Sequence, residues 1–349
     1  MNLRTIVVKL AARGLLVAVA TGALSTIALA TDLKLATIAP EGSSWMKELR
    51  AAGATVRDKT GGRVNIKFYG GGIQGTDKKV LRKIRIGQLQ GGVFTSNSLE
   101  ERYPDIMIYG LPMLFNSQAE VDYVRQRMDA KLTAGLDQAG FASYGFAGGG
   151  FAYFMTNKPV TGVNDMRGQK IWVPEGDQTS YTAMEALKLS PVVLPVTDVL
   201  TGLETGLLDI VATPPVGAVV LQWYTKTRYV TNLPLSYTLG FLAIDKGALK
   251  AVSPADQAVL REAMTALYKR FDAQNRVDNT KAEQALRANG LKCVEPNAAE
   301  APQWRAAVAT AMDGMAAKGA FSPGLLAEIR KHLEDYRKAK PAAAPAPRP

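Results

Sequence analysis

Few residues in this sequence could do chemistry. The chain has one cysteine, Cys293, and one histidine, His332. It therefore cannot form a zinc cluster of His and Cys ligands, a Cys–His nucleophile pair or a CxxC redox motif. Glu175 and Asp177 are a carboxylate pair of the kind that can act in acid–base catalysis. No nucleophile or base stands beside them, which favours a solvated turn that caps a helix beginning near Ser180. We expect no catalytic residue, no metal site and no cofactor.

The run Gly148-Gly149-Gly150 could be taken for a phosphate-binding loop. Neither a GxxxxGK[ST] nor a GxGxxG pattern opens a helix nearby, which argues against phosphate binding. Glycines in a strand instead allow two backbones to approach closely. We expect that role here, followed by a strand from Phe151 to Thr156.

The elements that must position these residues alternate between strand and helix patterns, which predicts an α/β fold with a mostly parallel sheet. In the first half, strand patterns at 33–38 and 64–69 alternate with helices that begin near Ser43 and Thr76. In the second, strands at 170–173, 192–194 and 208–212 alternate with helices near 180–187 and 198–203. The capping box Ser253-Pro254-Ala255-Asp256 then opens a helical pattern that reaches about Asn289. This is one long helix or two helices with a kink. Cys293 is expected to be a small buried residue.

The two ends of the chain have their own signals. Arg4, Lys9 and Arg13 precede an apolar run from Gly14 to Leu24 and the small-residue site Ala28-Leu29-Ala30. Residues 1–30 are thus predicted to be a signal peptide cleaved after about Ala30, and an uncleaved anchor is the alternative. Residues 339–349 form an Ala/Pro tail that is expected to be disordered. The net charge of +11 becomes +8 without the three basic leader residues (11 − 3). These charges are scattered, which argues against nucleic-acid binding.

Several short motifs, taken in order, resemble the DctP family of TRAP transporter receptors. They are Thr60-Gly61-Gly62-Arg63, Gly72-Ile73-Gln74-Gly75-Thr76-Asp77, Leu111-Pro112-Met113-Leu114-Phe115, Asp165-Met166-Arg167-Gly168-Gln169-Lys170-Ile171 and Leu203-Glu204-Thr205-Gly206-Leu207-Leu208-Asp209. No single motif is specific, but their order and spacing together are.

This resemblance implies a two-lobed periplasmic binding protein fold (type II-like), with a ligand cleft between the lobes and a long connecting helix. Lobe I would comprise residues 32–149 and about 239–280. Lobe II would comprise 150–238 and about 281–338. Clefts between lobes are common ligand sites, and hinge closure traps the ligand.

The resemblance also implies where the ligand binds, and here the sequence departs from the family. The family's carboxylate-binding arginines match Trp172 and Ala152, so the bidentate clamp for an acid is absent. A ligand that is apolar or aromatic in part is therefore expected. An acid held by Lys78 or Arg102 is the alternative. Trp172 alternates with Ile171 and Val173, so from the residues alone it is as readily core as cleft wall. The other candidate ligand-binding residues are Phe151, Thr213, Asp77, Thr95, Trp223 and Tyr224. Asp77 could equally cap a helix.

These observations predict a periplasmic receptor that binds a small organic solute and delivers it to the small and large membrane subunits of a TRAP permease. The long helix could also pair two protomers. An exported enzyme, or a ligand-sensing accessory protein on the same scaffold, is the alternative. An enzyme would have to rely on Glu175 and Asp177.

Overall fold

The computed structural model describes residues 30–339, and the compact unit described below begins at Thr31. The predicted signal peptide and the predicted disordered tail lie outside the described residues, apart from Ala30 and Ala339. No helix within residues 30–339 is long and apolar enough to cross a membrane.

Two sets of three parallel strands form the frame of this unit. In the first set β1 pairs with β2 and β3, and in the second β6 pairs with β7 and β8. Their bounds are Thr31–Ala36 (β1), Val64–Tyr69 (β2), Gly91–Thr95 (β3), Ile171–Pro174 (β6), Pro191–Leu194 (β7) and Ile210–Thr213 (β8). The helices that alternate with them are Ser44–Lys59 (α2), Asp77–Arg85 (α3), Val163–Met166 (α5), Gln178–Ala186 (α6), Val199–Glu204 (α7) and Pro215–Val220 (α8). The predicted alternation of strands and helices is confirmed.

Two long antiparallel strands join these sets into one sheet. They are β5 (Phe146–Thr156) and β10 (Ser236–Asp245), and the strand order is β2-β1-β3-β10-β5-β8-β6-β7. The prediction that β5 begins at Phe151 is wrong, because β10 pairs with it from Phe146 onward. The triple glycine therefore lies inside a strand. Three short strands complete the sheet: Phe141–Ala142 (β4), Tyr229–Thr231 (β9) and Lys292–Val294 (β11).

The triple glycine lies where β5 and β10 change register. Gly148 pairs with Leu239 and Gly150 with Thr238, so Gly149 is the extra residue of a bulge. A Cβ atom on Gly148 would lie 1.8 Å from Tyr237 Oη, and Gly150 has a φ of +99°. The glycines therefore make room for side chains of β10 and α10 rather than for the second backbone that was predicted. The sequence-based lobe limits at 149/150 and 238/239 both fall at this bulge.

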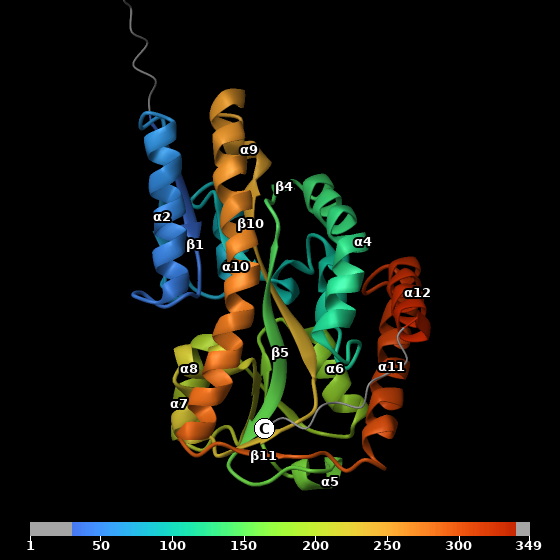
Figure 1. Ribbon diagram of the computed structural model, residues 1–349. Coiled ribbons are helices and arrows are strands. Elements are labelled where there is room, and N and C mark those ends of the chain that lie inside the picture. Colours follow the sequence, from blue (N-terminus) through green and yellow to red (C-terminus); the bar gives the residue numbers. More distant parts are fainter. Residues whose placement is uncertain (1–29, 340–349) are drawn as a thin grey trace, which may run out of the picture. The chain divides into compact units, whose positions relative to one another are not determined.

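The long helix α10 (Pro254–Ala288) is continuous over 35 residues, so the alternative of two kinked helices does not apply. Ser253 caps its start by accepting a hydrogen bond from the Asp256 backbone N–H at 3.1 Å. Figure 1 shows α10 running along β5, and it contacts α2 and α8. The helix thus bridges elements that flank both strand sets.

Polar side chains of α10 hold the glycine segment. Asp272 Oδ1 accepts from the Gly148 N–H at 2.8 Å, and Asn275 Nδ2 donates to the Gly148 carbonyl at 3.0 Å. One turn later, Asn279 Nδ2 donates to the Gly149 carbonyl at 2.7 Å. Asn279 Oδ1 also accepts from the Val216 N–H in α8 at 3.1 Å. One face of α10 therefore fixes both the crossing strand and a helix of the second set.

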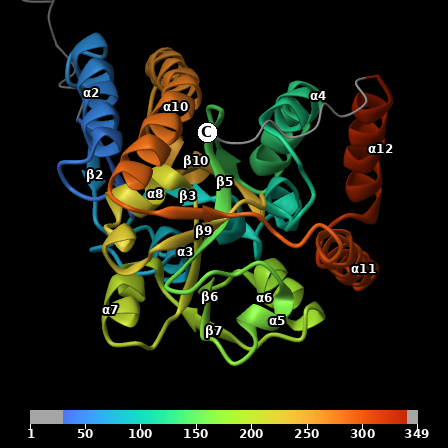
Figure 2. The same ribbon diagram turned by 60° about the horizontal axis from the view of Figure 1, so that its bottom comes forward.

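The remaining helices pack around this frame. They are Gln118–Gln138 (α4), Lys246–Leu249 (α9), Ala301–Ala317 (α11) and Pro323–Ala339 (α12). Figure 2 shows α11 beside α6 and α12 beside α4. The prediction that Cys293 is buried is wrong. It is partly exposed, because β11 lies at an edge and pairs with β9 alone.

Candidate functional site

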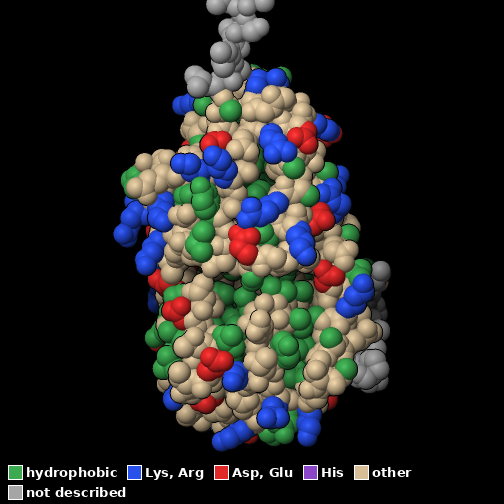
Figure 3. Space-filling model, turned by 90° about the vertical axis from the view of Figure 1, so that its left-hand side faces the viewer, with side chains coloured by type: hydrophobic (Ala, Val, Ile, Leu, Met, Phe, Trp, Pro, Cys, Tyr) green, Lys and Arg blue, Asp and Glu red, His purple; other side chains and the backbone are tan. Residues whose placement is uncertain are grey.

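A cavity of about 370 Å³ lies at the carboxyl ends of both parallel strand sets. Ile38 follows β1, Thr95 ends β3, Pro174 ends β6 and Thr213 ends β8, and all four line the cavity. The carboxyl edge of parallel strands is where α/β proteins bind ligands, because loops rather than helices cover that edge. On the face seen in Figure 3, hydrophobic side chains gather in a hollow at mid-height, and charged side chains surround it.

Two tryptophans form part of the cavity wall. Trp172 is 6% exposed, and its Nε1 donates to the Leu194 carbonyl at 2.9 Å. Trp223, which lies in the 3-10 helix Trp223–Lys226, packs edge-to-face on Trp172 with ring centroids 5.0 Å apart. Because the Trp172 N–H is already used, this residue offers the cavity an apolar surface. Further aromatic residues line the cavity: Trp45, Phe94, Phe154, Tyr237, Tyr268 and Phe271.

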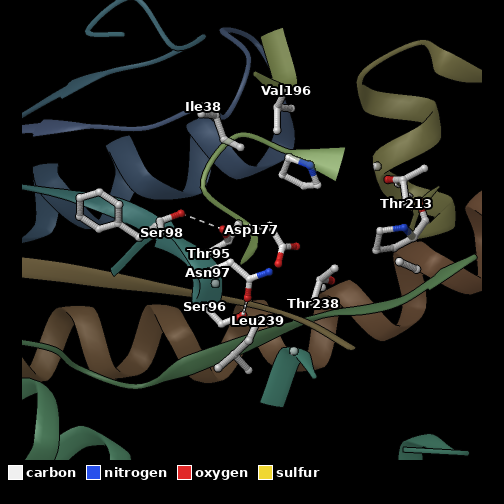
Figure 4. A pocket seen from close by; sticks show the side chains of 18 of the residues that line it. Ile38, Thr95, Ser96, Asn97, Ser98, Asp177, Val196, Thr213, Thr238 and Leu239 are labelled. Carbon is white, nitrogen blue, oxygen red and sulfur yellow. Dashed lines mark hydrogen bonds between the residues drawn. The ribbon is translucent and has the colours of Figure 1, made fainter. Parts of the chain in front are cut away.

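Small polar side chains also line the cavity. Figure 4 shows Thr95, Asn97 and Ser98 together on one side of the pocket and Thr213 on the other. Thr95, Asn97 and Ser98 come from the end of β3 and the 3-10 helix that follows it (Ser96–Leu99). Thr95 Oγ1 and Ser98 Oγ are 2.9 Å apart and share a hydrogen bond. The cavity therefore combines apolar surface with a few hydrogen-bonding groups, as small-molecule sites do.

The charged residues that line the cavity are mostly acidic. They are Asp77, Glu175 and Asp177, with Lys78 as the cationic residue among the described lining residues. No arginine lines the cavity among residues 30–339.

Asp177 is the N-cap of α6, as predicted. Its Oδ1 accepts from the Ser180 N–H at 2.9 Å and from Thr179 Oγ1 at 2.8 Å, and its Oδ2 accepts from Ser180 Oγ at 2.6 Å. The predicted solvated position is wrong for Asp177, because it is buried. Glu175, two residues earlier, is exposed. The turn lies against the cavity, so only its outer side reaches water.

Two further carboxyl groups have raised pKa values. Burial raises the pKa of Asp77, and the nearby charge of Glu175 raises it further, while a hydrogen bond from Ser98 opposes the shift. Thr76 rather than Asp77 is the N-cap residue of α3, so the alternative of Asp77 as a cap does not hold. Burial, and then the charge of Asp177, raise the pKa of Glu100 to about 7. Negative charge is thus concentrated at this end of the site.

Six of the eight ligand-binding residues predicted from the sequence line the cavity, and two do not. Those that do are Trp172, Ala152, Thr213, Asp77, Thr95 and Trp223. Phe151 instead packs edge-to-face on Tyr237 with ring centroids 5.2 Å apart. Phe154 lines the cavity in its place, because residues three apart in a strand lie on opposite faces. Tyr224 packs against the hydrophobic cluster that contains Trp172 and Trp223.

The sequence analysis missed several lining residues. Asn97, Val196 and Thr238 come from a 3-10 helix, from the segment after β7 and from the crossing strand β10. No motif marks them, because the tertiary fold alone brings them together. Arg102 does not line the cavity. Its guanidinium lies 5.6 Å from the Phe141 ring centroid, and its Nη2 donates to the Ala139 carbonyl.

This chemistry suits binding rather than catalysis. Both oxygens of Asp177 accept hydrogen bonds that cap a helix, so they are engaged in holding the turn. Within residues 30–339 no group of His, Cys, Asp and Glu could hold a metal ion. An apolar-walled cavity between two α/β strand sets, joined by two crossing strands and a bridging helix, defines a two-lobed solute-binding protein.

Comparisons with known proteins identify the family. The family described as "Bacterial extracellular solute-binding protein, family 7" (DctP) matches residues 35–319. The chain therefore belongs to the DctP family. It is 25% identical to the C4-dicarboxylate-binding periplasmic protein DctP of Rhodobacter capsulatus over 264 residues, which are 74% of this chain and 78% of that protein. It is also 25% identical to the protein YiiZ of Salmonella typhimurium over 227 residues, 62% of this chain and 67% of that protein.

Solved structures share the fold. A TRAP periplasmic solute-binding protein from Ralstonia eutropha with bound acetolactate has a TM-score of 0.80 at 21% identity, covering 87% of this chain and 99% of that one. One from Xanthobacter autotrophicus with bound β-D-galacturonate has a TM-score of 0.78 at 20% identity, covering 86% and 99%. The two-lobed fold inferred from the sequence is confirmed. Members of this family are solute-binding receptors.

Proposed function

We propose that this protein is the periplasmic receptor of a TRAP-type secondary transporter, and that its solute is apolar or aromatic in part rather than a simple dicarboxylate. One observation carries the second half of this proposal. The described lining of the cavity holds several aromatic rings and no arginine. Trp172 and Ala152 stand where the family resemblance places the carboxylate-binding arginines.

The size of the missing interaction supports this choice. A hydrogen bond to a charged group contributes about 1.5–3 kcal/mol, so a lost bidentate pair weakens acid binding well over tenfold. Lys78 could offer a single point charge in its place. It is exposed, however, and it lies within reach of Gly176, beside Glu175 and Asp177. A solute carboxylate would have to approach those two acidic side chains.

Family membership supports the wider role. Receptors of this family hand their solute to the small and large membrane subunits of a TRAP permease, and we propose the same partners here. The leader pattern of residues 1–30 supports export to the periplasm with cleavage after about Ala30. The bulge at Gly149 interrupts the regular pairing of the two strands that cross between the sets. We propose that the protein bends at this bulge when it closes on its solute.

A thermal-shift screen of residues 31–349 tests the ligand class. One panel holds dicarboxylates, keto acids and sugar acids, and the other holds neutral, aromatic and long-chain compounds. A ligand at about 100 times its dissociation constant adds about 2.7 kcal/mol, which raises the midpoint by several degrees. We expect shifts from the second panel. Strong shifts from simple dicarboxylates alone would refute the proposed ligand class.

Two phenylalanines of one strand give a matched control for the site. Phe154 lines the cavity and Phe151 does not, although both are buried in β5. Phe154→Leu should weaken binding of a compound found in the screen, and Phe151→Leu should leave its affinity unchanged. Equal losses would show that the compound binds elsewhere.

A further inference from the structure

The charge inside the cavity indicates more about the solute than its apolar walls do. Asp77, Glu175 and Asp177 face Lys78, so the described charged residues of the lining sum to about −2 when all are ionised. Lys78 and Glu175 are exposed, whereas Asp177 is buried and Asp77 is half-buried. The inner part of the cavity therefore holds two carboxyl groups and, among the described residues, no basic side chain.

Asp177 and Asp77 differ in how their charges are compensated. Three donors and the start of α6 stabilise the charge of Asp177. Asp77 receives a hydrogen bond from Ser98 alone among the described residues. The other charged groups around Asp77 are Glu175, which raises its pKa, and Lys78, whose exposed ammonium lies near Gly176. Asp77 also lies at a helix start, in the first turn of α3, but it accepts one side-chain hydrogen bond where Asp177 accepts three from its neighbours. A half-buried carboxylate without an opposite charge beside it is favoured by a cationic partner.

A second observation in the same cavity is independent of the acids. Tyr268 of α10 lines the cavity and is 2% exposed, and its hydroxyl has no hydrogen-bond partner among the described residues. This oxygen is enclosed in the described structure, so contact with a solute requires the Tyr268 ring to shift. Aromatic rings also attract cations through their faces, and the cavity wall contains several.

We propose that the solute carries a cationic nitrogen that lies against Asp77, with its apolar part against Trp172 and Trp223. This inference rests on the proposed receptor function and adds the charge class of the solute. Closure on an anion would add a third negative group to the inner cavity. Closure on a neutral solute would leave Asp77 uncompensated. Closure on an ammonium group would pair that charge and draw α3 towards the β6–α6 turn.

Calorimetric titration with three compounds that share one apolar body tests the charge class. Phenethylamine, phenethyl alcohol and hydrocinnamate carry an ammonium, a hydroxyl and a carboxylate group. We expect the amine to bind at least about tenfold more tightly than the alcohol, and the acid to bind most weakly.

Two variants test whether the carboxylate of Asp77 binds the ammonium group. Asp77→Asn should weaken amine binding by about ten- to a hundredfold, while alcohol binding changes little. Asp58→Asn removes one exposed carboxylate at the end of α2 and should change neither. If Asp77→Asn misfolds, the comparison of the three compounds on the wild-type protein decides the matter alone.

The outcomes separate the two proposals. If the acid or the alcohol binds as tightly as the amine, or if the amine fails while compounds of the wider panels stabilise the protein, the cationic class is wrong and the receptor function stands. If no compound of any panel binds, both proposals are wrong.

Discussion

The contact between Gly148 and Tyr237 gives the sharpest test of how the crossing strands are packed. Gly148→Ala would place its Cβ 1.8 Å from Tyr237 Oη and 2.8 Å from Cζ. The backbone φ of Gly148 lies outside the left-handed region, so the methyl group itself is the perturbation. The Tyr237 ring cannot withdraw easily, because Phe115 and Phe151 pack against it edge-to-face.

The expected loss in the free energy of unfolding follows from these contacts. Extra volume in a packed core costs about 1–3 kcal/mol. Displacing Tyr237 also breaks the hydrogen bond that Gln118 Nε2 donates to its hydroxyl at 3.2 Å, which adds about 1 kcal/mol. We expect Gly148→Ala to lower the free energy of unfolding by about 2–4 kcal/mol. Tyr237→Phe alone should cost about 1 kcal/mol.

A double-mutant cycle in urea isolates the clash. The double variant lacks the hydroxyl that the methyl group meets, so it should cost at least about 1 kcal/mol less than the sum of the single variants. Gly314→Ala is the control, since nothing lies within 4 Å of its added Cβ, and this helical position should gain up to about 1 kcal/mol. Additive costs, or a Gly148→Ala variant as stable as the wild type, would refute the proposed packing.

Two further predictions concern the pH dependence of stability and the hydrogen bonds that Asn279 makes at the bulge. Burial holds the folded-state pKa of Glu100 at about 7, above its ordinary value of 4.5, so the wild type loses stability as pH rises through this interval. In urea melts, Glu100→Gln should therefore raise the free energy of unfolding by about 1–2 kcal/mol at pH 8, after allowance for solvent screening, and leave it unchanged at pH 4. An unchanged pH dependence would contradict this. Asn279→Ala should cost about 2–3 kcal/mol because it leaves the Gly149 carbonyl and the Val216 N–H without this partner. Exposed Thr280→Ala should cost under about 0.5 kcal/mol in the same melts.

The sequence predicted the frame because its signals are local. Alternating apolar residues and turn glycines placed five of the six parallel strands, and the capping box at Ser253 placed the start of α10. The strand β3 was not predicted. The start of β5 was missed because three glycines carry no strand propensity, and pairing with β10 alone makes them a strand. Tertiary contacts decide such segments, so sequence patterns do not reveal them.

The candidate site was predictable where it lies at strand ends. Thr213 directly follows a predicted strand, and the family match selected Thr95, Trp172 and Ala152. The choice between Phe151 and Phe154 required knowing which face of β5 the cavity takes, and this depends on the tertiary fold. The burial of Asp177 also depends on the fold, because its turn lies against elements that are distant in the chain.

The tryptophan at position 172 is part of the protein's core as well as of the cavity wall. Its ring packs on Trp223, its Nε1 donates to the Leu194 carbonyl, and both tryptophans belong to one hydrophobic cluster. Trp172→Arg would therefore leave the Trp223 ring unpacked and bury a guanidinium group inside this cluster, which costs stability whether or not an acid is present. We therefore expect Trp172→Arg to lower the free energy of unfolding, because it disturbs packing between two aromatic residues from separate elements. Under the proposed function, this loss of packing would accompany any gain in acid binding.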